Sequence, residues 1–277
     1  MSWMICAAVF LATYFLNMIV ISVFYHRGLT HGAVRFSPRT RRLVGRLGVW
    51  TTGIDPKAWV CMHRQHHQFS DAPSDPHSPV HQGFWGVLTG QLRSYESVLR
   101  SLIRHRPQVE RVVQDLDFDV SWPNRIGHWY LPYLAHLLVA VLIAAVFGSW
   151  ALGLSYWLGM MSHPIQGWII NSFGHAVGGR NFNTPDNSRN NHIAAWLVLG
   201  EGLQNNHHRF PASAKFSFHR HEIDIGFWVC RILEKLRVLE IRREGLIPSP
   251  QDFSPRAGPY QGRSLDSGDR LAASPSR

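Results

Sequence analysis

The distribution of charge along the chain constrains its fold more than any other feature. Residues 1–25 and 128–172 contain no Asp, Glu, Lys or Arg, although the 277-residue chain carries 28 basic and 18 acidic residues and a net charge of +10. Both segments are long and mostly apolar. Because about 20 apolar residues in a helix span the hydrocarbon core of a bilayer, this segregation predicts an integral membrane protein and excludes a simple soluble globule.

The apolar segments divide into about three predicted transmembrane helices. These are residues 3–24, 129–147 and 150–172, with Gly148 and Ser149 joining the last two as a helical hairpin. The blocks between and after the spans, 26–127 and 173–248, hold the basic residues, so the positive-inside rule predicts that both lie in the cytosol. The membrane would then be a bacterial inner membrane or one of the endoplasmic-reticulum type.

The predicted fold class is therefore an all-α multi-pass membrane protein with a cytosolic helical cap. Residues 43–60 and 93–106 are interrupted by charges and read as helices at the membrane interface. We expect one domain over residues 1–248 and a disordered tail over 249–277, which is rich in Pro, Ser, Gly and Arg. Attraction to anionic lipid headgroups explains the net positive charge better than nucleic-acid binding does.

Histidine is abundant, with 17 copies, and it gathers in short motifs beside the predicted spans. The motifs are His26 and His31 in YHRGLTH, then His63, His66 and His67 in HRQHH, then Asn171 and His175 in NSFGH, and finally Gln204, His207 and His208 in QNNHH. On a helix, offsets of three and four residues place side chains along one face. Because all the motifs lie on one predicted side of the membrane, we expect them to converge on a single site.

The chemistry indicated by this cluster is metal binding. Neutral imidazole is a common ligand of Zn, Cu, Fe and Ni, and eight histidines are too many for one ion, so two metals are implied. The three widely spaced cysteines exclude a four-cysteine zinc or iron-sulfur site. Two simpler interpretations are solvated surface histidines and a membrane metal-binding or transport protein, although transport would place polar ligands in the middle of the bilayer.

Over residues 25–243, the chain resembles the membrane fatty-acyl desaturases of the stearoyl-CoA Δ9 type, particularly their bacterial and plant acyl desaturase branch. The resemblance is carried by four motifs in order, namely HRGLTH, DPKAWVCMHRQHHQFSDAPSDPHSPVHQGFW, NSFGHAVGGRNFNTPDNSRNN and GEGLQNNHHRFP, with an apolar hairpin between the second and third. It implies an enzyme with a non-haem centre of two irons and O2 as co-substrate. The implied reaction introduces a cis double bond, Δ9 in this branch, into a long saturated acyl chain.

The resemblance also implies roles for individual residues. The implied metal ligands are His26, His31, His63, His66, His67, His175, His207 and His208, with Asn171 acting through a water and Gln204 as a further candidate. Since the sequence contains no flavin or haem motif, a separate ferredoxin or cytochrome b5-like protein would supply the electrons. A related histidine-rich hydroxylase is the alternative within the same chemistry. No catalytic side chain beyond the metal centre is implied.

Three departures from the family pattern bear on this interpretation. Gln204 takes the place of the first histidine of the usual H-x-x-H-H motif, and an amide oxygen is a weaker ligand than imidazole. Cys61 and Met62 stand where animal acyl-CoA members have an Arg-Asp pair that helps to hold CoA, so a lipid or a carrier protein becomes as plausible a carrier as CoA. Only 25 residues precede His26, which implies a shortened three-span core or an incomplete start.

Carboxylates and aromatic residues near the motifs complete the expected site. Ligating histidines usually donate their second ring N–H to an acceptor, and the nearest acceptors in sequence are Asp55, Asp75, Asp186, Glu201 and Asp224. His77 is left outside the ligand set because its spacing is typical of a loop. The candidate linings of an acyl tunnel are Trp50, Trp59, Phe84, Trp85, Trp129, Trp168 and Trp196.

Overall fold

The computed structural model describes residues 2–245, and within them the chain is mostly helical. The predicted tail at 249–277 lies outside the described residues. The elements are α1 (Trp3–Ile19), η1 (Val20–Thr30), β1 (Val34–Phe36), α2 (Pro38–Thr52), α3 (Pro56–Phe69), α4 (Pro79–Gln82), α5 (Gly86–Ile103), α6 (Pro107–Glu110), η2 (Arg111–Val113), α7 (Trp122–Arg125), α8 (Leu131–Phe147), α9 (Trp150–Met160), α10 (His163–Trp168), η3 (Ile169–Phe173), α11 (Gly174–Ala176), α12 (His192–Leu197), α13 (Gln204–Arg209), α14 (Ile225–Lys235) and β2 (Leu239–Ile241).

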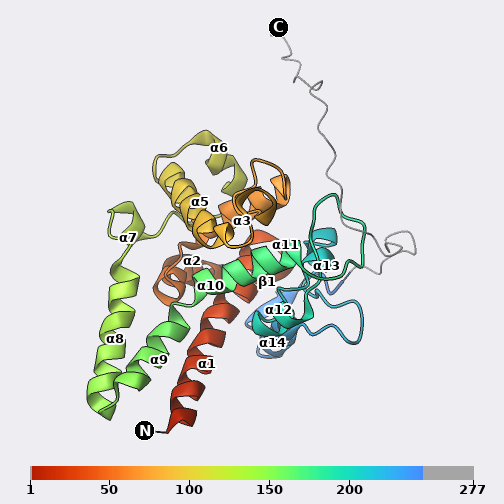
Figure 1. The fold of residues 1–277 in the computed structure, drawn as a ribbon. Helices are drawn as coiled ribbons and strands as arrows, with labels where there is room; N and C mark the ends of the chain where they lie inside the picture. Colours follow the sequence, from red (N-terminus) through yellow and green to blue (C-terminus); the bar gives the residue numbers. More distant parts are fainter. Residues whose placement is uncertain (1, 246–277) are drawn as a thin grey trace.

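Three apolar helices project together from the rest of the molecule. Figure 1 shows α1, α8 and α9 side by side, pointing away from the helices that form the cap. Helix α1 continues without a break into η1, and together they form one helix from Trp3 to Thr30 that is long and apolar enough to cross a membrane. Helix α8 is also apolar but has only 17 residues. By length and composition, one helix of the described chain therefore qualifies as a span.

The predicted continuous span over residues 150–172 is wrong. Helix α9 ends at Met160, and the chain leaves helical geometry before α10 begins at His163. Pro164 explains the break, because proline lacks an N–H and its ring would clash with the carbonyl of residue 160 if the helix continued. The 11 residues of α9 cover only about 17 Å, which is too short to cross a bilayer unaided.

The cap is built around α3, which packs against η1 and α5. Asp55 caps the start of α3 by accepting hydrogen bonds from the backbone N–H groups of Lys57 and Ala58, and Pro56 occupies the first helical position. Buried side chains from η1, α3 and α5, including Tyr25, Val60 and Leu102, form the largest apolar core. The cap thereby fixes the position of α3 against η1.

The two predicted interfacial helices have different outcomes. Residues 43–60 form no single helix, because Gly53 adopts a left-handed conformation (φ 75°) that ends α2 before α3 begins. Residues 93–106 fall largely within α5, which begins earlier, at Gly86, and ends at Ile103.

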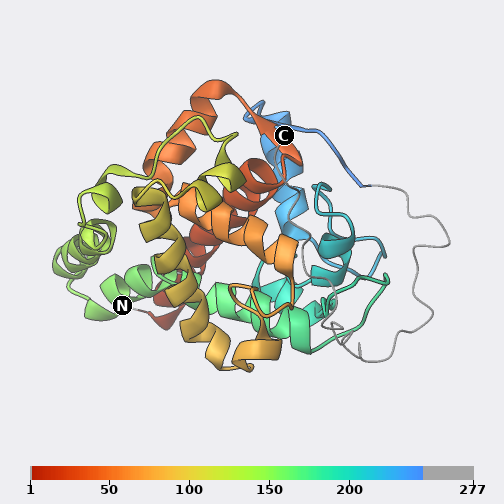
Figure 2. The same ribbon diagram turned by 90° about the horizontal axis from the view of Figure 1, so that it is seen from above.

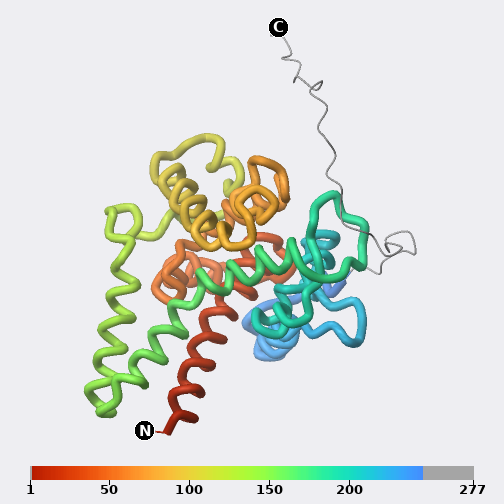
Figure 3. The backbone as a smooth tube through the Cα atoms, viewed as in Figure 1, coloured from red at the N-terminus to blue at the C-terminus, as the bar shows by residue number. Residues whose placement is uncertain are grey.

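A two-stranded antiparallel sheet joins the segment after η1 to the C-terminal end of the described chain. Strand β1 pairs with β2 in the register Val34↔Ile241 and Phe36↔Leu239. In the view from above (Figure 2), the C-terminal helices lie beside η1 and α3, with α8 seen almost along its axis at the far side. The tube in Figure 3 shows the segment from α10 to α11 running under α3 and α5 towards α13. Residues from distant parts of the sequence thus meet beneath α3.

Candidate metal centre

The first histidine pair is aligned by the local geometry of η1. In an α-helix, residues five apart point about 140° away from each other, so His26 and His31 would face different directions. Here the backbone N–H of His31 donates to the carbonyl of His26 at 3.2 Å, which is the i→i+5 pattern of a π-helix. The two rings consequently lie 4.9 Å apart, centroid to centroid. The π-helical turn therefore converts the H-x4-H spacing into a pair of neighbouring rings.

Helix α3 carries the second motif and divides it between two groups. The prediction that HRQHH is helical is confirmed. His63 and His67, one turn apart, point towards His26 and His31, whereas His66 points towards His175 and His208. Helix α3 is therefore the element shared by both groups.

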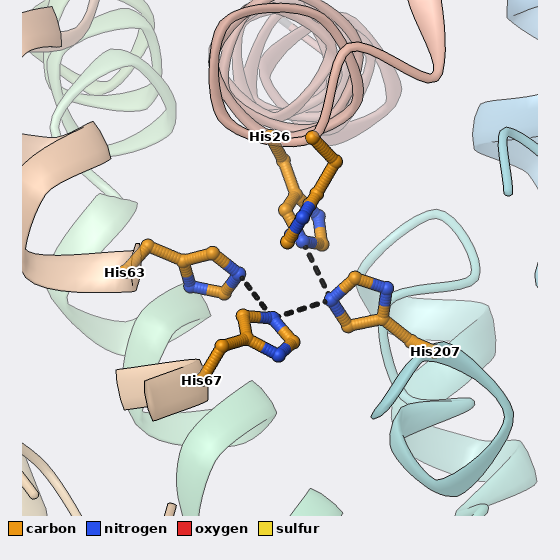
Figure 4. A group of neighbouring side chains, drawn as sticks. His26, His63, His67 and His207 are labelled. Atoms are coloured by element: carbon orange, nitrogen blue, oxygen red, sulfur yellow. Dashed lines mark hydrogen bonds between the residues drawn. The ribbon is translucent and has the colours of Figure 1, made fainter. Parts of the chain in front are cut away.

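The first group comprises five histidines: His26, His31, His63, His67 and His207. Each offers a ring nitrogen, and these nitrogens all lie within 4.8 Å of one another. The Nε2 atom of His67 lies 3.0 Å from that of His63 and 2.9 Å from that of His207, whose Nε2 is also 2.9 Å from that of His26. Figure 4 shows these four rings converging from η1, α3 and α13. We call this set the five-histidine group.

The second group comprises His66, His175 and His208, whose ligand atoms also lie within 4.8 Å of one another. We call this set the three-histidine group. In each member, Nδ1 donates to a carboxylate. His66 donates to Asp75 at 3.0 Å, His175 to Asp71 at 3.0 Å and His208 to Asp186 at 2.6 Å. Each Nε2 is buried and has no hydrogen-bond partner. Since Nδ1 carries the proton, each Nε2 presents a lone pair to its neighbours.

Three imidazoles of the five-histidine group are shifted towards the neutral form. Burial lowers the pKa of His63, His67 and His207 well below the usual value, and the neighbouring rings lower it further. Neutral imidazole is the form that binds metal ions.

In the three-histidine group the carboxylate partners are ionised. Burial lowers the pKa of His208 to about 4 despite the opposing effect of Asp186. Burial is the largest single effect on Asp71 and would raise its pKa, but the hydrogen bond and charge attraction of His175, together with hydrogen bonds from Ser78 and Asn187, lower it to about 2. At His175, burial is the largest single effect and would lower the pKa, but the hydrogen bond to Asp71 and the negative charges of Asp71, Asp186 and Asp75 together raise it, so a metal ion there competes with a proton.

Both groups fit metal ions better than they fit a purely protein environment. With Nδ1 of His26 donating to Glu201 at 2.7 Å, its Nε2 is an acceptor that faces another imidazole nitrogen. One N–H on His67 can serve only one of its two Nε2 neighbours. Nitrogens about 3.0 Å apart match ligands at right angles around an ion with metal–nitrogen distances of about 2.1 Å. The orphaned Nε2 atoms of the three-histidine group lead to the same conclusion.

The two amide candidates lie at the edge of these groups. Asn171 donates from Nδ2 to Gln91 at 3.4 Å, and Gln204 donates from Nε2 to the backbone carbonyl of Glu201 at 2.7 Å. Both line the same cavity as His26 and His63. The amide nitrogen of Gln204 is thus directed to the backbone, which leaves its oxygen as the atom available for a ligand.

Of the five carboxylates predicted as hydrogen-bond acceptors for the histidines, three have this role. These three carboxylates accept hydrogen bonds from histidines: Asp75 from His66, Asp186 from His208 and Glu201 from His26. Asp55 and Asp224 do not contact the histidines. Asp55 caps α3 and binds Ser121, whereas Asp224 caps α14 and pairs with the buried Arg27 at 2.9 Å.

Sequence reasoning missed Asp71 and left His77 outside the ligand set, although both lie beside the histidines of the three-histidine group. Asp71 orients His175 although 104 positions separate them, and no local spacing signals this contact. His77 stacks on His66 with ring centroids 4.4 Å apart, and both of its ring nitrogens are buried without a partner. Its ligand atoms and those of His66 and Asp75 lie within 4.8 Å of one another. The motif DPHSP, which contains His77, was the available signal.

A mainly apolar cavity adjoins the histidines. It runs from His26, His63 and His77 past Trp59, Met62, Tyr95 and Tyr133 towards α10, and Met18, Ile21, Ile54, Leu92 and Ile170 also line it. Of the predicted aromatic linings, Trp59 belongs to this cavity. Trp85, Trp129 and Trp196 are instead largely exposed on the surface. An apolar chain in this cavity would lie beside the histidine groups.

Comparison with known proteins identifies the family. A family model described as fatty acid desaturase matches residues 1–223. A hex-5-enoyl-[acyl-carrier protein] acetylenase of Moorena producens is 32% identical over 237 residues, covering 80% of this chain and 71% of its own length. The icosanoyl-CoA 5-desaturase of Limnanthes douglasii is 32% identical, covering 78% of this chain but only 58% of its own length. The Delta-9 acyl-lipid desaturase 1 of Arabidopsis thaliana is 30% identical, covering 81% and 70%. The chain therefore belongs to the fatty acid desaturase family, whose members are oxidoreductases of acyl chains.

Proposed function

We propose that this protein is an O2-dependent acyl desaturase with a centre of two irons at the cytosolic surface of a membrane. The observation that carries the proposal is the set of three buried Nε2 lone pairs on His66, His175 and His208, each oriented by a carboxylate, next to the five-histidine group. Protein side chains alone cannot oxidise an alkyl chain, so the chemistry requires such a centre.

The two histidine groups would each hold one iron. His26, His31, His63, His67 and His207 would bind the first, and His66, His175 and His208 the second, with Asn171 acting through a water and Gln204 through its oxygen. When bound, the irons supply the oxidising power for removing hydrogen from unactivated carbon. Glu201, Asp71, Asp75 and Asp186 hold the imidazoles in one tautomer and orientation.

The reaction removes one hydrogen from each of two adjacent CH2 groups and forms a cis double bond. O2 accepts the two substrate electrons, two external electrons and four protons, and becomes two waters. The external electrons require a separate donor of the ferredoxin or cytochrome b5 type. The basic residues of the cap, including the exposed Arg42 and Arg243, suit an acidic donor.

The substrate we propose is a long saturated acyl chain that is desaturated at Δ9. Support for Δ9 comes from the motif resemblance and from the Arabidopsis relatives, whereas other relatives bear Δ5 names. The names of the relatives include acyl-carrier protein, CoA and acyl-lipid forms. Cys61 is completely buried and packs beneath α6, with its thiol directed to the carbonyl of Val109 at 3.7 Å, so this position does not offer CoA a charged contact. We therefore favour a lipid-bound or carrier-protein-bound chain.

The apolar cavity would bind this chain and exclude water from the reacting carbons. Trp59 lies flat against His63, with centroids 4.9 Å apart, and both line the cavity. The α1–η1 helix, which contributes Met18 and Ile21, would place the cavity at the membrane boundary, where an acyl chain can enter from the lipid. We propose a multi-pass arrangement in which the α8–α9 hairpin accompanies α1.

The test is expression in a host that lacks unsaturated fatty acids, followed by gas chromatography of the lipids and metal analysis of the purified protein. We expect a new cis double bond and about two irons per chain. His66→Ala should abolish the product while the protein remains in the membrane fraction, whereas His105→Ala, at an exposed histidine of the cap, should not. A hydroxy acid would indicate a hydroxylase, and zinc without oxidation would contradict the proposal.

A further inference from the structure

Helices α12 and α14 each expose large apolar side chains. These are Ile193, Trp196 and Leu197 from α12 and Trp228, Ile232 and Leu236 from α14 and its C-terminal end. Ile193 is 76% exposed and Leu236 66% exposed. A patch of this kind is unfavourable in water and marks a surface that contacts lipid or another protein. We call these six residues the apolar shelf.

The exposed apolar side chains of α14 lie on one face of the helix. Trp228, Ile232 and Leu236 recur every four residues and therefore form one stripe, whereas Gly226, Phe227 and Cys230 face the protein interior. The inward face is secured independently, because Asp224 caps the helix and the N–H of Gly226 donates to the carbonyl of Leu199 at 2.8 Å. The outward stripe is thus not needed to hold α14 in place.

The position of α12 beside α1 indicates that the surface in contact with the apolar shelf is lipid. The hydroxyl of Tyr14 donates to the carbonyl of Leu197 at 2.9 Å. Tyr14 lies about 17 Å along the helix from Trp3, and about 24 Å separate it from Thr30, so α12 is attached near the middle of the long apolar helix. In Figure 1, α12 and α14 lie beside α1 on the side of the cap from which α1 projects. The shelf is therefore level with side chains such as Leu11 and Leu16, which are themselves exposed.

The charges next to the shelf also fit a lipid surface. Arg231, Lys235 and Arg237 are exposed and interleave with Ile232 and Leu236. Arg231 also pairs with Glu234 at 3.2 Å. Apolar side chains bordered by basic ones match the boundary between acyl chains and anionic headgroups.

We propose that the shelf is embedded in the cytosolic leaflet of the bilayer, with Lys235 and Arg237 at the level of anionic headgroups. This inference rests on the proposed membrane location of α1. Helix α13, which carries Gln204, His207 and His208, lies between α12 and α14 in the chain. By holding both flanking helices in the leaflet, the shelf fixes the depth of the metal centre relative to the acyl chains.

Site-directed spin labelling tests the shelf in the full chain. The three native cysteines are buried, so the wild-type chain is the labelling blank and single cysteines can be introduced at exposed positions. Ile232→Cys and Trp196→Cys probe the two helices of the shelf, and the use of two sites guards against one variant failing to fold. Leu11→Cys on α1 is the lipid control, and Glu96→Cys on α5, with 60% side-chain exposure, is the water control.

The labelled protein is reconstituted in vesicles of phosphatidylcholine and phosphatidylglycerol, and collisions of the nitroxide with O2 and with a water-soluble nickel chelate are measured. We expect both shelf labels to collide more with O2 than with nickel, as at Leu11, and the label at Glu96 to show the reverse. Shelf labels that behave like Glu96 while Leu11 remains lipid-exposed would overturn the shelf alone. A water-exposed label at Leu11 would overturn the membrane location as well.

Discussion

The two histidine groups differ in how their imidazole rings are held in orientation. The five-histidine group has many imidazoles but one carboxylate partner, Glu201 on His26, whereas every member of the three-histidine group has its own. In the first group the rings orient one another through nitrogen contacts of 2.9–3.0 Å. In the second group, an ionised aspartate accepts the Nδ1–H of each ring and fixes its orientation. A group with surplus ligands should tolerate the loss of one, while a group with three should not.

The largest expected effect is the loss of one metal when the smaller group is reduced to two histidines. His208→Ala should lower the iron content by about one per chain and abolish desaturation. His31→Ala, at a member of the five-histidine group, should retain both metals at saturating iron. Metal analysis of both variants, purified side by side, provides the measurement. Equal metal losses in the two variants would show that the groups do not differ in redundancy.

A smaller effect is expected when an aspartate behind the three-histidine group is neutralised. Asp186→Asn keeps the shape of the side chain but weakens the acceptor of the His208 hydrogen bond, so iron affinity should fall by about 10–100-fold. A competition titration with a chelator measures this change. Asp117→Asn, at an exposed partner of Arg41, is the matched control and should leave the affinity unchanged.

Glu201→Gln should affect stability more than metal binding. In the five-histidine group, Glu201 orients only His26, and the other four histidines have no carboxylate partner among the described residues. Iron affinity should therefore change by less than about tenfold. Glu201 also accepts from the completely buried Arg27 at 2.5 Å, and weakening this ion pair should lower the free energy of unfolding by about 1–3 kcal/mol. Denaturant titration in detergent, run beside the chelator titration, separates the two quantities. A large loss of iron at unchanged stability would contradict the comparison.

The smallest effect is expected at Gln204. Gln204→His restores the usual H-x-x-H-H motif and adds an imidazole to the cavity that His26 and His63 line, so iron content should remain about two and affinity should rise or stay unchanged. The electronic spectrum of the iron protein provides a measurement independent of activity. A folded protein without iron would contradict the prediction that this position accommodates a further imidazole ligand.

Much of the site could be predicted from local spacing, and the remainder could not. The helical offsets in HRQHH and QNNHH identify side chains that share a face, and the structure places them in helices α3 and α13. The contact of Asp71 with His175 joins segments far apart in the sequence, and Asp71 itself adopts a left-handed backbone conformation (φ 59°). Such a contact depends on the packing of whole elements, which no motif records.

The bounds of the predicted membrane spans differ from the helices of the structure in two places. The apolar composition of residues 150–172 suggested one helix, but Pro164 divides it, and this break was readable from the sequence. Composition alone also did not show that the helix from Trp3 would continue to Thr30, past the expected end at residue 24. The continuation depends on the i→i+5 winding of η1, which is supported by its burial in the cap.

The wide sequence separation of neighbouring histidines has a consequence for how the protein is made. His26 and His31 lie at the end of the α1–η1 helix and are synthesised well before their neighbour His207, which follows His26 by 181 residues. A metal ion cannot meet its full set of ligands until synthesis has passed residue 208. If the proposed irons bind here, their delivery would be a late step of biogenesis, completed after α1, α8 and α9 have all emerged.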